Sequence, residues 1–154
     1  MDRYEEAIAR LGLTIPEPGT PVANFVPHVM TGKLVYVSGQ IPIRDGKVCF
    51  VGKLGKDFDI ERGQEAARYC ALQVLGVIRQ ACGGNLDKVV RCVRLGGFIN
   101  STPEFADQPQ VMNGASDLMV AVFGERGRHA RAAVGVNSLP RGVAVEVDAI
   151  FEIK

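Results

Sequence analysis

Two charged residues near the C-terminal end of the sequence are of types that could carry out chemistry together. Arg131 lies near the start of an alternating apolar run that ends at Val136, and Glu146 lies inside a second run, 145–150, beyond a turn at 139–142. On neighbouring strands, a guanidinium can hold a small carboxylate bidentately, and a carboxylate beside it can transfer protons. The alternative is that both are solvated strand residues. The choice between the two interpretations depends on the elements that position Arg131 and Glu146.

Other residues that often carry chemistry stand in patterns with less meaning. Ser38 lacks a surrounding Gly-x-Ser-x-Gly elbow, which favours a hydrogen-bonding role over that of a nucleophile. His28 and His129 are the only histidines, and both are expected at surface positions. With no paired acidic motif beside them, a metal site is not expected. The glycines form neither Gly-x-Gly-x-x-Gly nor a P-loop, so no cofactor is predicted.

Composition indicates a single domain with no strong overall charge. The 154 residues include 18 Lys plus Arg against 17 Asp plus Glu, so no global field favours nucleic acid or an acidic membrane. No apolar run approaches the roughly 18 residues of a membrane span, and residues 1–6 are too acidic and polar for a secretory signal. The four cysteines form no Cys-x-x-Cys pair. We therefore expect reduced thiols and a cytoplasmic location.

The first 22 residues are expected to form a segment apart from the rest. Asp2 and Glu5 resemble a capping box ahead of a short amphipathic helix that ends at Gly12. Residues 14–21 contain three prolines and a glycine, which predicts an extended connector. The predicted organisation is an N-terminal helix and connector at 1–22 and one domain at 23–154.

Alternating patterns after residue 24 predict strands. Residues 25–30 and 34–38 flank Thr31-Gly32-Lys33 and should form a β-hairpin. Pro27 lacks a ladder donor, so the first strand should lie at an edge or be bulged there. Arg44 to Lys47 is a second turn signal. Residues 86–99 read as a further strand, in which Gly96-Gly97 indicates a bulge or a close backbone approach.

Two longer segments have helical periodicity. The first runs from about Ile60 to Cys82, capped by Asp57 or Asp59, and the second runs from near Pro103 or Pro109 to Phe123. Each carries one apolar stripe, so together they can cover one face of a sheet of four to six strands. The predicted fold class is α+β, a two-layer sandwich of a mixed β-sheet with two helices on one face.

Alternation also predicts which residues face the helices. On the last strand, Val145 and every second residue after it should pack beneath the helices, which leaves Glu146 on the open face. On the preceding strand the pattern places Ala132, Val134 and Val136 in the core and Arg131, Ala133 and Gly135 on the open face. A face of small residues and isolated charges is typical of a subunit interface with a cleft, so we expect a homo-oligomer.

Two paired motifs resemble the Rid family, also called YjgF or the endoribonuclease L-PSP family. The early motif is Val35-Tyr36-Val37-Ser38-Gly39-Gln40-Ile41-Pro42, and the late one runs from Ala130-Arg131-Ala132 through Leu139 to Val145-Glu146-Val147. The resemblance covers about residues 24–153. His129 and Asn137 depart from the late motif, since Pro or Ala is usual at the first position and a small or basic residue at the second.

The resemblance implies a chorismate-mutase-like fold assembled as a homotrimer with clefts between subunits. It implies binding of small 2-imino or 2-keto carboxylic acids and cofactor-independent hydrolysis of reactive enamine or imine acids to 2-keto acids and ammonia, the activity of a deaminase. By similarity, Arg131 would clamp the substrate carboxylate and Glu146 would position or activate water. Ser38 and Gly39 would line the cleft, with Asn113 matching an asparagine on the second helix.

Two positions depart from the archetypal pocket and leave alternatives open. Phe25 and Ala133 stand where the family has a Tyr and a Cys, so a hydroxyl and a thiol that could contact the substrate nitrogen are missing. A non-catalytic, metabolite-binding or regulatory trimer is therefore the alternative function. The arginines Arg126, Arg128, Arg131 and Arg141 could support a ribonuclease, but without interleaved aromatics RNA binding is disfavoured.

Overall fold

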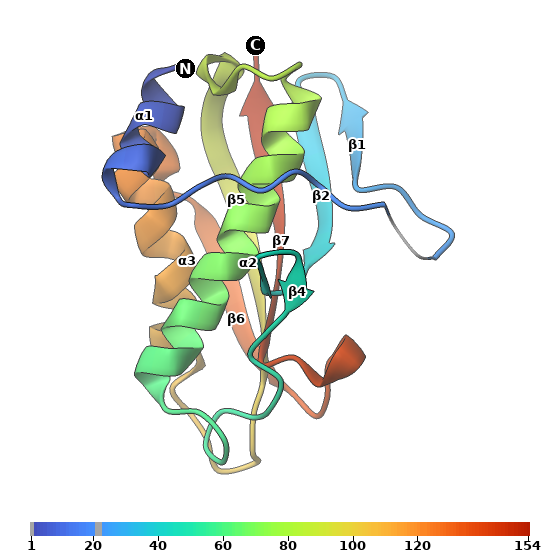
Figure 1. The fold of residues 1–154 in the computed structure, drawn as a ribbon, viewed down its shortest axis with the longest axis vertical. Coiled ribbons are helices and arrows are strands. Elements are labelled where there is room, and N and C mark those ends of the chain that lie inside the picture. Colours follow the sequence, from blue (N-terminus) through green and yellow to red (C-terminus); the bar gives the residue numbers. More distant parts are fainter. Residues whose placement is uncertain (1, 21–22) are drawn as a thin grey trace.

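A five-stranded sheet and the helices on one side of it form the protein (Figure 1). The computed structural model describes residues 2–20 and 23–154. The helices are α1 (Arg3–Arg10), α2 (Ile60–Ala81), α3 (Gln108–Phe123) and the 3₁₀ turns η1 (Leu86–Lys88), η2 (Gly124–Gly127) and η3 (Pro140–Gly142). The strands are β1 (His28–Thr31), β2 (Leu34–Gln40), β3 (Ile43–Arg44), β4 (Lys47–Val48), β5 (Val89–Asn100), β6 (Ala130–Val136) and β7 (Val145–Ile153).

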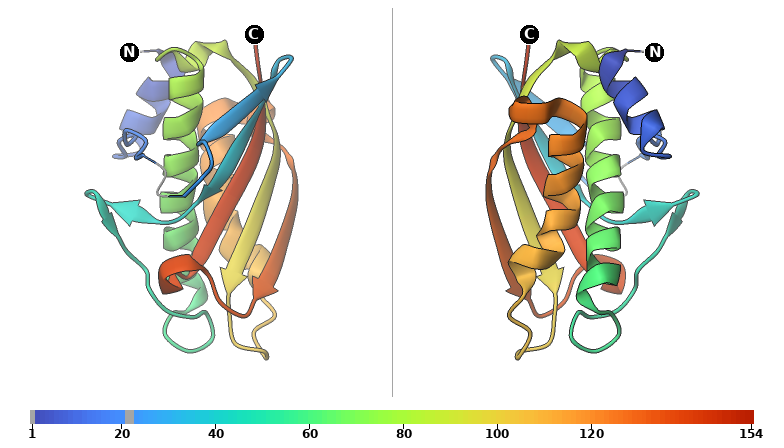
Figure 2. Two further views of the ribbon diagram at one scale, coloured as in Figure 1. Left: turned by 90° about the vertical axis from the view of Figure 1, so that its right-hand side faces the viewer. Right: turned by 90° about the vertical axis from the view of Figure 1, so that its left-hand side faces the viewer.

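The sheet is mixed and has one open face. Its strand order is β1-β2-β7-β5-β6, with β5 and β6 parallel and the other neighbours antiparallel. The two side views in Figure 2 show α2 and α3 against one face, while none of the helices in the described part of the chain covers the other. This arrangement confirms the predicted α+β two-layer sandwich, and it confirms that β1, which follows Pro27, lies at an edge.

Local sequence explains where the helices begin and end. Asp59 caps α2 by accepting a hydrogen bond from the Arg62 amide at 2.9 Å, which settles the choice between Asp57 and Asp59. Pro109 lies in the first turn of α3, where a missing amide hydrogen costs nothing. Gly124 ends α3 with a φ of 62°, a conformation that glycine adopts without steric cost.

Close contacts between backbones set the spacing of the two layers. A Cβ at Gly114 of α3 would strike the backbone of Gln64 in α2, so the two helices touch there directly. A Cβ at Gly97 of β5 would meet the side chain of Met112. Gly97 thus marks a close approach rather than a bulge, and the register shifts of β5 lie nearer its start, before Arg94.

The N-terminal segment packs onto the same core. Asp2 caps α1 by accepting from the amides of Tyr4 and Glu5, as the capping signal predicts. The Tyr4 ring lies edge-on to Phe123 of α3 with 4.7 Å between centroids, and Ile8 and Ile15 are buried in the core cluster. The division of the chain at residue 22 stays a prediction.

Strand β7 follows the predicted alternation, whereas β6 does not. From Val145 to Ile153 every second residue of β7 is buried under the helices, and Glu146 lies on the open face. On β6, Arg131 pairs with Leu95 of β5, which is fully buried under the helices, so Arg131 faces the helices. Val134 is 47% exposed on the open face.

The predicted sidedness of β6 is therefore wrong. Because β6 is an edge strand, its helix-facing side meets the face of α3 that carries Asn113 and Ser116 instead of a deep apolar core. Ala133 packs partly against the core, and Gly135 faces the side chains of Gln108 and Ser101. The apolar residues of β6 point to the open face. For this strand, the side with the more apolar residues is therefore not the side that faces the core.

Candidate functional site

Three neutral groups of α3 hold the Arg131 guanidinium. Nη1 donates to Asn113 Oδ1 at 2.8 Å and to Ser116 Oγ at 3.0 Å, and Nη2 donates to the Pro109 carbonyl at 3.0 Å. Asn113 and Ser116 follow Pro109 by four and seven residues, so the three acceptors lie on one face of the helix. These bonds leave the Nε hydrogen and one Nη2 hydrogen, on the two nitrogens that form one edge of the guanidinium.

The charge of Arg131 has no counter-ion within the described chain. Its acceptors are an amide, a hydroxyl and a carbonyl, and no carboxylate among residues 2–20 and 23–154 lies within salt-bridge distance of it. A half-buried guanidinium that is oriented but not neutralised is suited to bind an anion, and its planar edge fits a carboxylate.

His129 extends the network behind Arg131. Its Nε2 lies 2.8 Å from Ser116 Oγ, and its Nδ1 lies 2.6 Å from the Gly127 carbonyl oxygen. Burial lowers the pKa of His129, and the nearby Arg131 lowers it further, against an opposing effect of the Gly127 carbonyl. His129 is thus half-buried and not a surface residue as expected. We call Asn113, Ser116, His129 and Arg131 the Arg131 cluster.

A second group surrounds Glu146 on the opposite face of the sheet. The Glu146 carboxylate lies so close over Gly39 that a Cβ there would strike it. Ser38 donates to the carbonyl of Val26 at 2.7 Å, which fixes the segment ahead of β1 against β2. Burial raises the pKa of Glu146, and the neighbouring Asp148 raises it further. Ser38, Gly39, Glu146 and Asp148 form the Glu146 cluster.

The predicted site residues therefore fall into two separate sets within one chain. Asn113 and Ala133 lie beside Arg131 under α3, whereas Gly39, which follows Ser38 on β2, lies beside Glu146 on the other side of the sheet. Phe25, 52% exposed, precedes β1 next to the segment that Ser38 holds. Strand β5 separates β7 from β6, so one small acid cannot touch both clusters of one chain.

Sequence reasoning missed Ser116 and the role of His129. The signal for Ser116 was present, because Pro109, Asn113 and Ser116 stand at the spacing of one helix face. For His129, its departure from the family motif two residues before Arg131 was the available indication. Neither signal reveals the bond between the two side chains, which depends on how α3 lies against β6.

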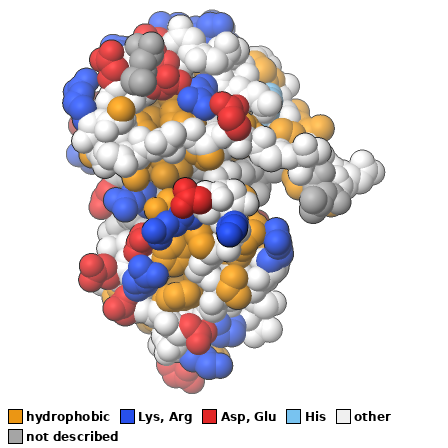
Figure 3. Space-filling view, in the orientation of Figure 1, with side chains coloured by type: hydrophobic (Ala, Val, Ile, Leu, Met, Phe, Trp, Pro, Cys, Tyr) orange, Lys and Arg blue, Asp and Glu red, His pale blue; other side chains and the backbone are white. Residues whose placement is uncertain are grey.

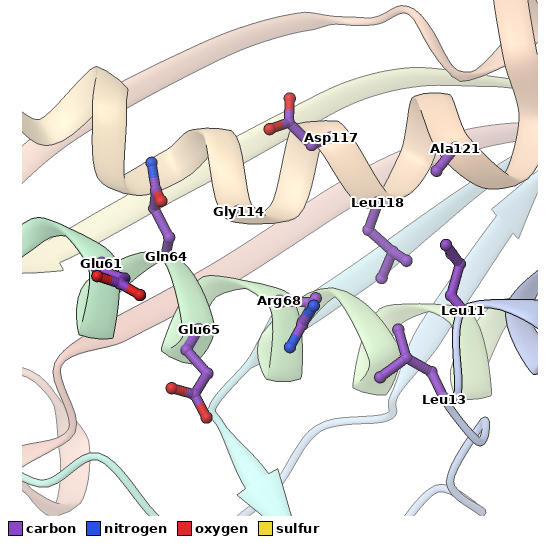
Figure 4. A pocket seen from close by; sticks show the side chains of 10 residues that line it. All are labelled: Leu11, Leu13, Glu61, Gln64, Glu65, Arg68, Gly114, Asp117, Leu118 and Ala121. Carbon is purple, nitrogen blue, oxygen red and sulfur yellow. The ribbon is translucent and has the colours of Figure 1, made fainter.

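A pocket between the two long helices lies away from both clusters. It has a volume of about 450 Å³ between α2 and α3, is closed at one end by Leu11 and Leu13, and contains none of the predicted site residues (Figure 4). Its polar lining includes Glu61, Glu65, Arg68 and Asp117. On this helix-covered side, charged side chains are scattered among apolar ones (Figure 3). We place no part of the predicted site there.

The structure gives little support to a metal site, a membrane span or an RNA-binding surface. Within the described residues, His, Cys, Asp and Glu side chains nowhere gather in a group of three or more that could hold a metal ion. None of the helices in residues 2–20 and 23–154 has the length and apolar character needed to cross a membrane. The arginines near the late motif are dispersed: Arg128 pairs with Glu125 at 3.0 Å, Arg131 points to α3, and Arg141 lies beyond the far end of β6.

The mixed sheet with two helices on one face and charged residues on β6 and β7 defines the class of chorismate-mutase-like α+β proteins. A sequence model of the family described as "YjgF/chorismate mutase-like, putative endoribonuclease" matches residues 5–148. The chain therefore belongs to the YjgF family, as the paired motifs predict.

Individual relatives agree with this assignment. The chain is 50% identical to protein TCP17 of Trypanosoma cruzi over 98% of this chain and 94% of that protein. The crystal structure of protein Atu1372 from Agrobacterium tumefaciens superposes with a TM-score of 0.93 at 46% identity, covering 98% of this chain and 92% of that one. Escherichia coli TdcF, solved with bound serine, shares the fold with a TM-score of 0.61 at 23% identity, covering 92% and 96%.

Proposed function

We propose that the protein binds a small carboxylic acid in clefts between the subunits of a homotrimer and hydrolyses reactive enamine or imine acids there without a cofactor. The observation that carries this proposal is the Arg131 guanidinium, oriented by three neutral acceptors and free to bind a carboxylate along one edge. TdcF with bound serine supports the idea that this fold can hold a small amino acid.

The separation of the two clusters supports a site shared between subunits. Arg131 and Glu146 lie on opposite faces of one sheet, so a small acid can contact both only if they come from different copies. The open sheet face, which carries Glu146, would then lie against the edge of a neighbour that carries Arg131. A closed ring of such unlike contacts is a heterologous assembly, and a trimer is a small ring of this kind.

The proposed chemistry is hydration of a carbon–nitrogen double bond, which an enamine acid gains when its terminal carbon takes up a proton and its nitrogen loses one. Water adds to the imine carbon and gives up a proton while the nitrogen gains one, and the resulting carbinolamine expels ammonia as the carbonyl forms. Glu146, with a raised pKa, can accept the proton from water and return it to the departing nitrogen. Arg131 would hold the carboxylate throughout, and the pair Ser38 and Gly39 would form the wall beside Glu146.

A non-catalytic binding protein remains the second candidate function, favoured by Phe25 and Ala133. These side chains offer neither a hydroxyl nor a thiol to the substrate nitrogen. The carboxylate clamp does not depend on them. Acid binding is thus supported by more of the chain than turnover is. The dispersed arginines give no comparable support to a ribonuclease.

Replacing the two charged residues separates binding from catalysis. Arg131→Ala should weaken binding of 2-oxobutanoate by about 10- to 100-fold, because a hydrogen bond to a charged group contributes about 1.5–3 kcal/mol. Glu146→Gln should retain binding and lower turnover by about 10²–10⁴-fold. Binding is measured by calorimetry. Turnover is measured as faster decay of 2-aminoacrylate or an imino acid generated in the same vessel.

Arg126→Ala is the matched control, since Arg126 is an exposed arginine of the same segment outside both clusters. It should bind and turn over as wild type does. Unchanged affinity in Arg131→Ala would contradict the clamp. If wild-type protein leaves the spontaneous decay rate unchanged across a panel of imino acids but binds the oxo acid, the binding protein is the correct function.

A further inference from the structure

We infer that Ser116 and His129 are positioning residues that orient the Arg131 guanidinium for the carboxylate, an inference that rests on the proposed role of Arg131. Neither side chain belongs to the family motifs quoted above. They form a hydrogen-bonded chain that runs from Arg131 through Ser116 and His129 to the carbonyl of Gly127.

The chemistry of the groups sets the direction of every bond in this chain. A carbonyl oxygen can only accept, so His129 Nδ1, 2.6 Å from Gly127, carries the hydrogen. In the neutral ring Nε2 is then the acceptor, and the Ser116 hydroxyl donates to it across 2.8 Å. The Ser116 oxygen in turn accepts from Arg131 Nη1 at 3.0 Å. All donors point the same way, an arrangement in which each bond polarises the next.

The surroundings of His129 favour the neutral ring that this direction requires. Arg131 is the charged group of β6 that acts on the ring, and α3 presents the neutral Ser116. On the η2 side, the carboxylate of Glu125 is engaged by Arg128 at 3.0 Å. Burial lowers the pKa of His129 and Arg131 adds to this, so the Nε2 acceptor is kept at neutral pH.

The chain ends on backbone that is itself held in place. Gly127 is buried and closes the 3₁₀ turn η2, where a Cβ would strike the backbone of Met119 in α3. The carbonyl of Arg128 accepts a hydrogen bond from Arg91 Nη2 of β5 at 2.6 Å. The ring of His129 is therefore anchored to the carbonyl of Gly127 in a segment that is held at both residues, and it transmits that position to Ser116 and Arg131.

A serine beside a histidine can also be a nucleophile and its base. Here, the Ser116 oxygen accepts a hydrogen bond from a cationic guanidinium, which withdraws electron density from the lone pairs an attack would need. The group that orients the ring is a neutral carbonyl in place of a carboxylate, so an imidazolium formed during attack would lack a counter-charge. The geometry therefore favours positioning over covalent catalysis.

Paired substitutions test the inference with 2-oxobutanoate as the probe. Ser116→Ala and His129→Ala should each weaken binding about 10-fold, the order expected when a group that orients a charged hydrogen bond is lost. Ser116→Thr keeps the hydroxyl and should retain affinity. In an Arg131→Lys background, Ser116→Ala should lower the affinity for 2-oxobutanoate little further, because the guanidinium that Ser116 orients is absent. Ser138→Ala, at an exposed loop serine, is the control.

The state of the ring gives a second measurement that needs no ligand. Two-bond ¹H–¹⁵N spectra of wild-type protein should show His129 protonated at Nδ1 and not at Nε2 at pH 7.5. Ser116→Ala should keep this tautomer, because the Gly127 carbonyl remains, but should shift the Nε2 resonance, because Nε2 loses its hydrogen-bond donor. If wild type fails to bind 2-oxobutanoate, the proposed function fails for this acid, and the spectra still decide whether the chain of bonds exists. An Nε2-protonated ring in wild type would overturn the inference.

Two further outcomes also count against it. Wild-type affinity in folded Ser116→Ala protein would show that Arg131 needs no help from Ser116. Loss of turnover in the same variant with unchanged affinity would make Ser116 a reacting group and not a positioning residue. A general loss of fold would instead appear as a changed circular dichroism spectrum, which Ser116→Thr should not show.

Discussion

At the scale of single residues, the same type of side chain has different chemistry depending on its neighbours. The guanidinium of Arg128 is exposed and paired with Glu125, whereas that of Arg131 is half-buried among neutral acceptors and keeps its charge available. Asp148 lies 3.6 Å from Arg94, but Glu146, two residues away, pairs with no cation among the described residues. Residue type alone therefore does not show which arginine or which carboxylate lacks a partner of opposite charge among the described residues.

The environment of Glu146 predicts a pH-dependent cost in stability. Burial, with Asp148 adding to it, raises the folded-state pKa of Glu146 above its ordinary value of 4.5, so the folded chain binds this proton more tightly than the unfolded chain does. The contribution of Glu146 to stability consequently falls as pH rises from 4.5 through the folded pKa, and the ionised carboxylate remains unfavourable above it. Glu146→Gln removes this cost and should raise the melting temperature more at pH 7 than at pH 4.

Thermal denaturation at several pH values between 4 and 7 measures this difference. Glu104→Gln, at an exposed carboxylate, serves as the control and should shift the melting temperature by a similar small amount at every pH. A gain from Glu146→Gln that does not grow with pH would show that burial of the carboxylate is not costly.

At the scale of elements, the sequence pattern predicts the position of a helix or strand when that element packs one face against a continuous apolar core. The helices α2 and α3 and the strand β7 fall where periodicity places them, because each packs one continuous face against many apolar neighbours. The turn between β3 and β4 is also where Asp45 and Gly46 predict it, with φ values of 52° and 75°. Such features are determined within a few residues of the chain.

Strand β6 shows where this reasoning stops. Its pattern of small and apolar residues alternates, but the side that faces the helices depends on which part of α3 lies above it. There, the Pro109 carbonyl and the side chains of Asn113 and Ser116 accept hydrogen bonds from Arg131. The charged residue of β6 therefore faces the helices. Arg131, Asn113 and Glu146 could be named from the sequence, whereas Ser116 and the partition of the residues between two faces required the three-dimensional arrangement.

The contact between α2 and α3 depends on one small residue. At Gly114 the two helices approach until a Cβ would overlap the backbone of Gln64, and backbone cannot move aside as a flexible side chain can. Gly114→Ala should therefore lower the free energy of unfolding by about 1–3 kcal/mol despite the better helix propensity of alanine. Because Arg131 is held by α3, the same change should also weaken acid binding.

Urea denaturation compares this variant with Gly19→Ala, at an exposed glycine with open space around it. The control should change stability by well under 1 kcal/mol. Equal stability of the two variants would mean that the helices can separate at Gly114 without cost, and the packing argument would then be wrong.

At the scale of the whole molecule, the open sheet face is the surface that a single chain leaves without a partner. Val29 on β1, Tyr36 on β2 and Val134 on β6 point to this face and are 56%, 43% and 47% exposed. They span the sheet from edge to edge, and Glu146 lies among them on β7. A face with exposed apolar residues on three strands, and with a carboxylate of raised pKa among them, is the expected surface for the neighbour that would bring Arg131 to Glu146.

A charge placed on this face should prevent assembly and remove the shared site with it. Val134→Asp would force a carboxylate into the proposed interface, where desolvation without a partner is costly, and should yield a monomer that no longer binds 2-oxobutanoate. Leu11→Asp makes the same kind of change at a residue of similar exposure, 48% against 47%, on the helix-covered side and should leave both properties intact. Light scattering at micromolar concentration gives the mass, and calorimetry gives the affinity. A monomeric Val134→Asp that binds the acid as wild type does would show that one chain holds the complete site, whereas a trimeric Val134→Asp would place the interface elsewhere.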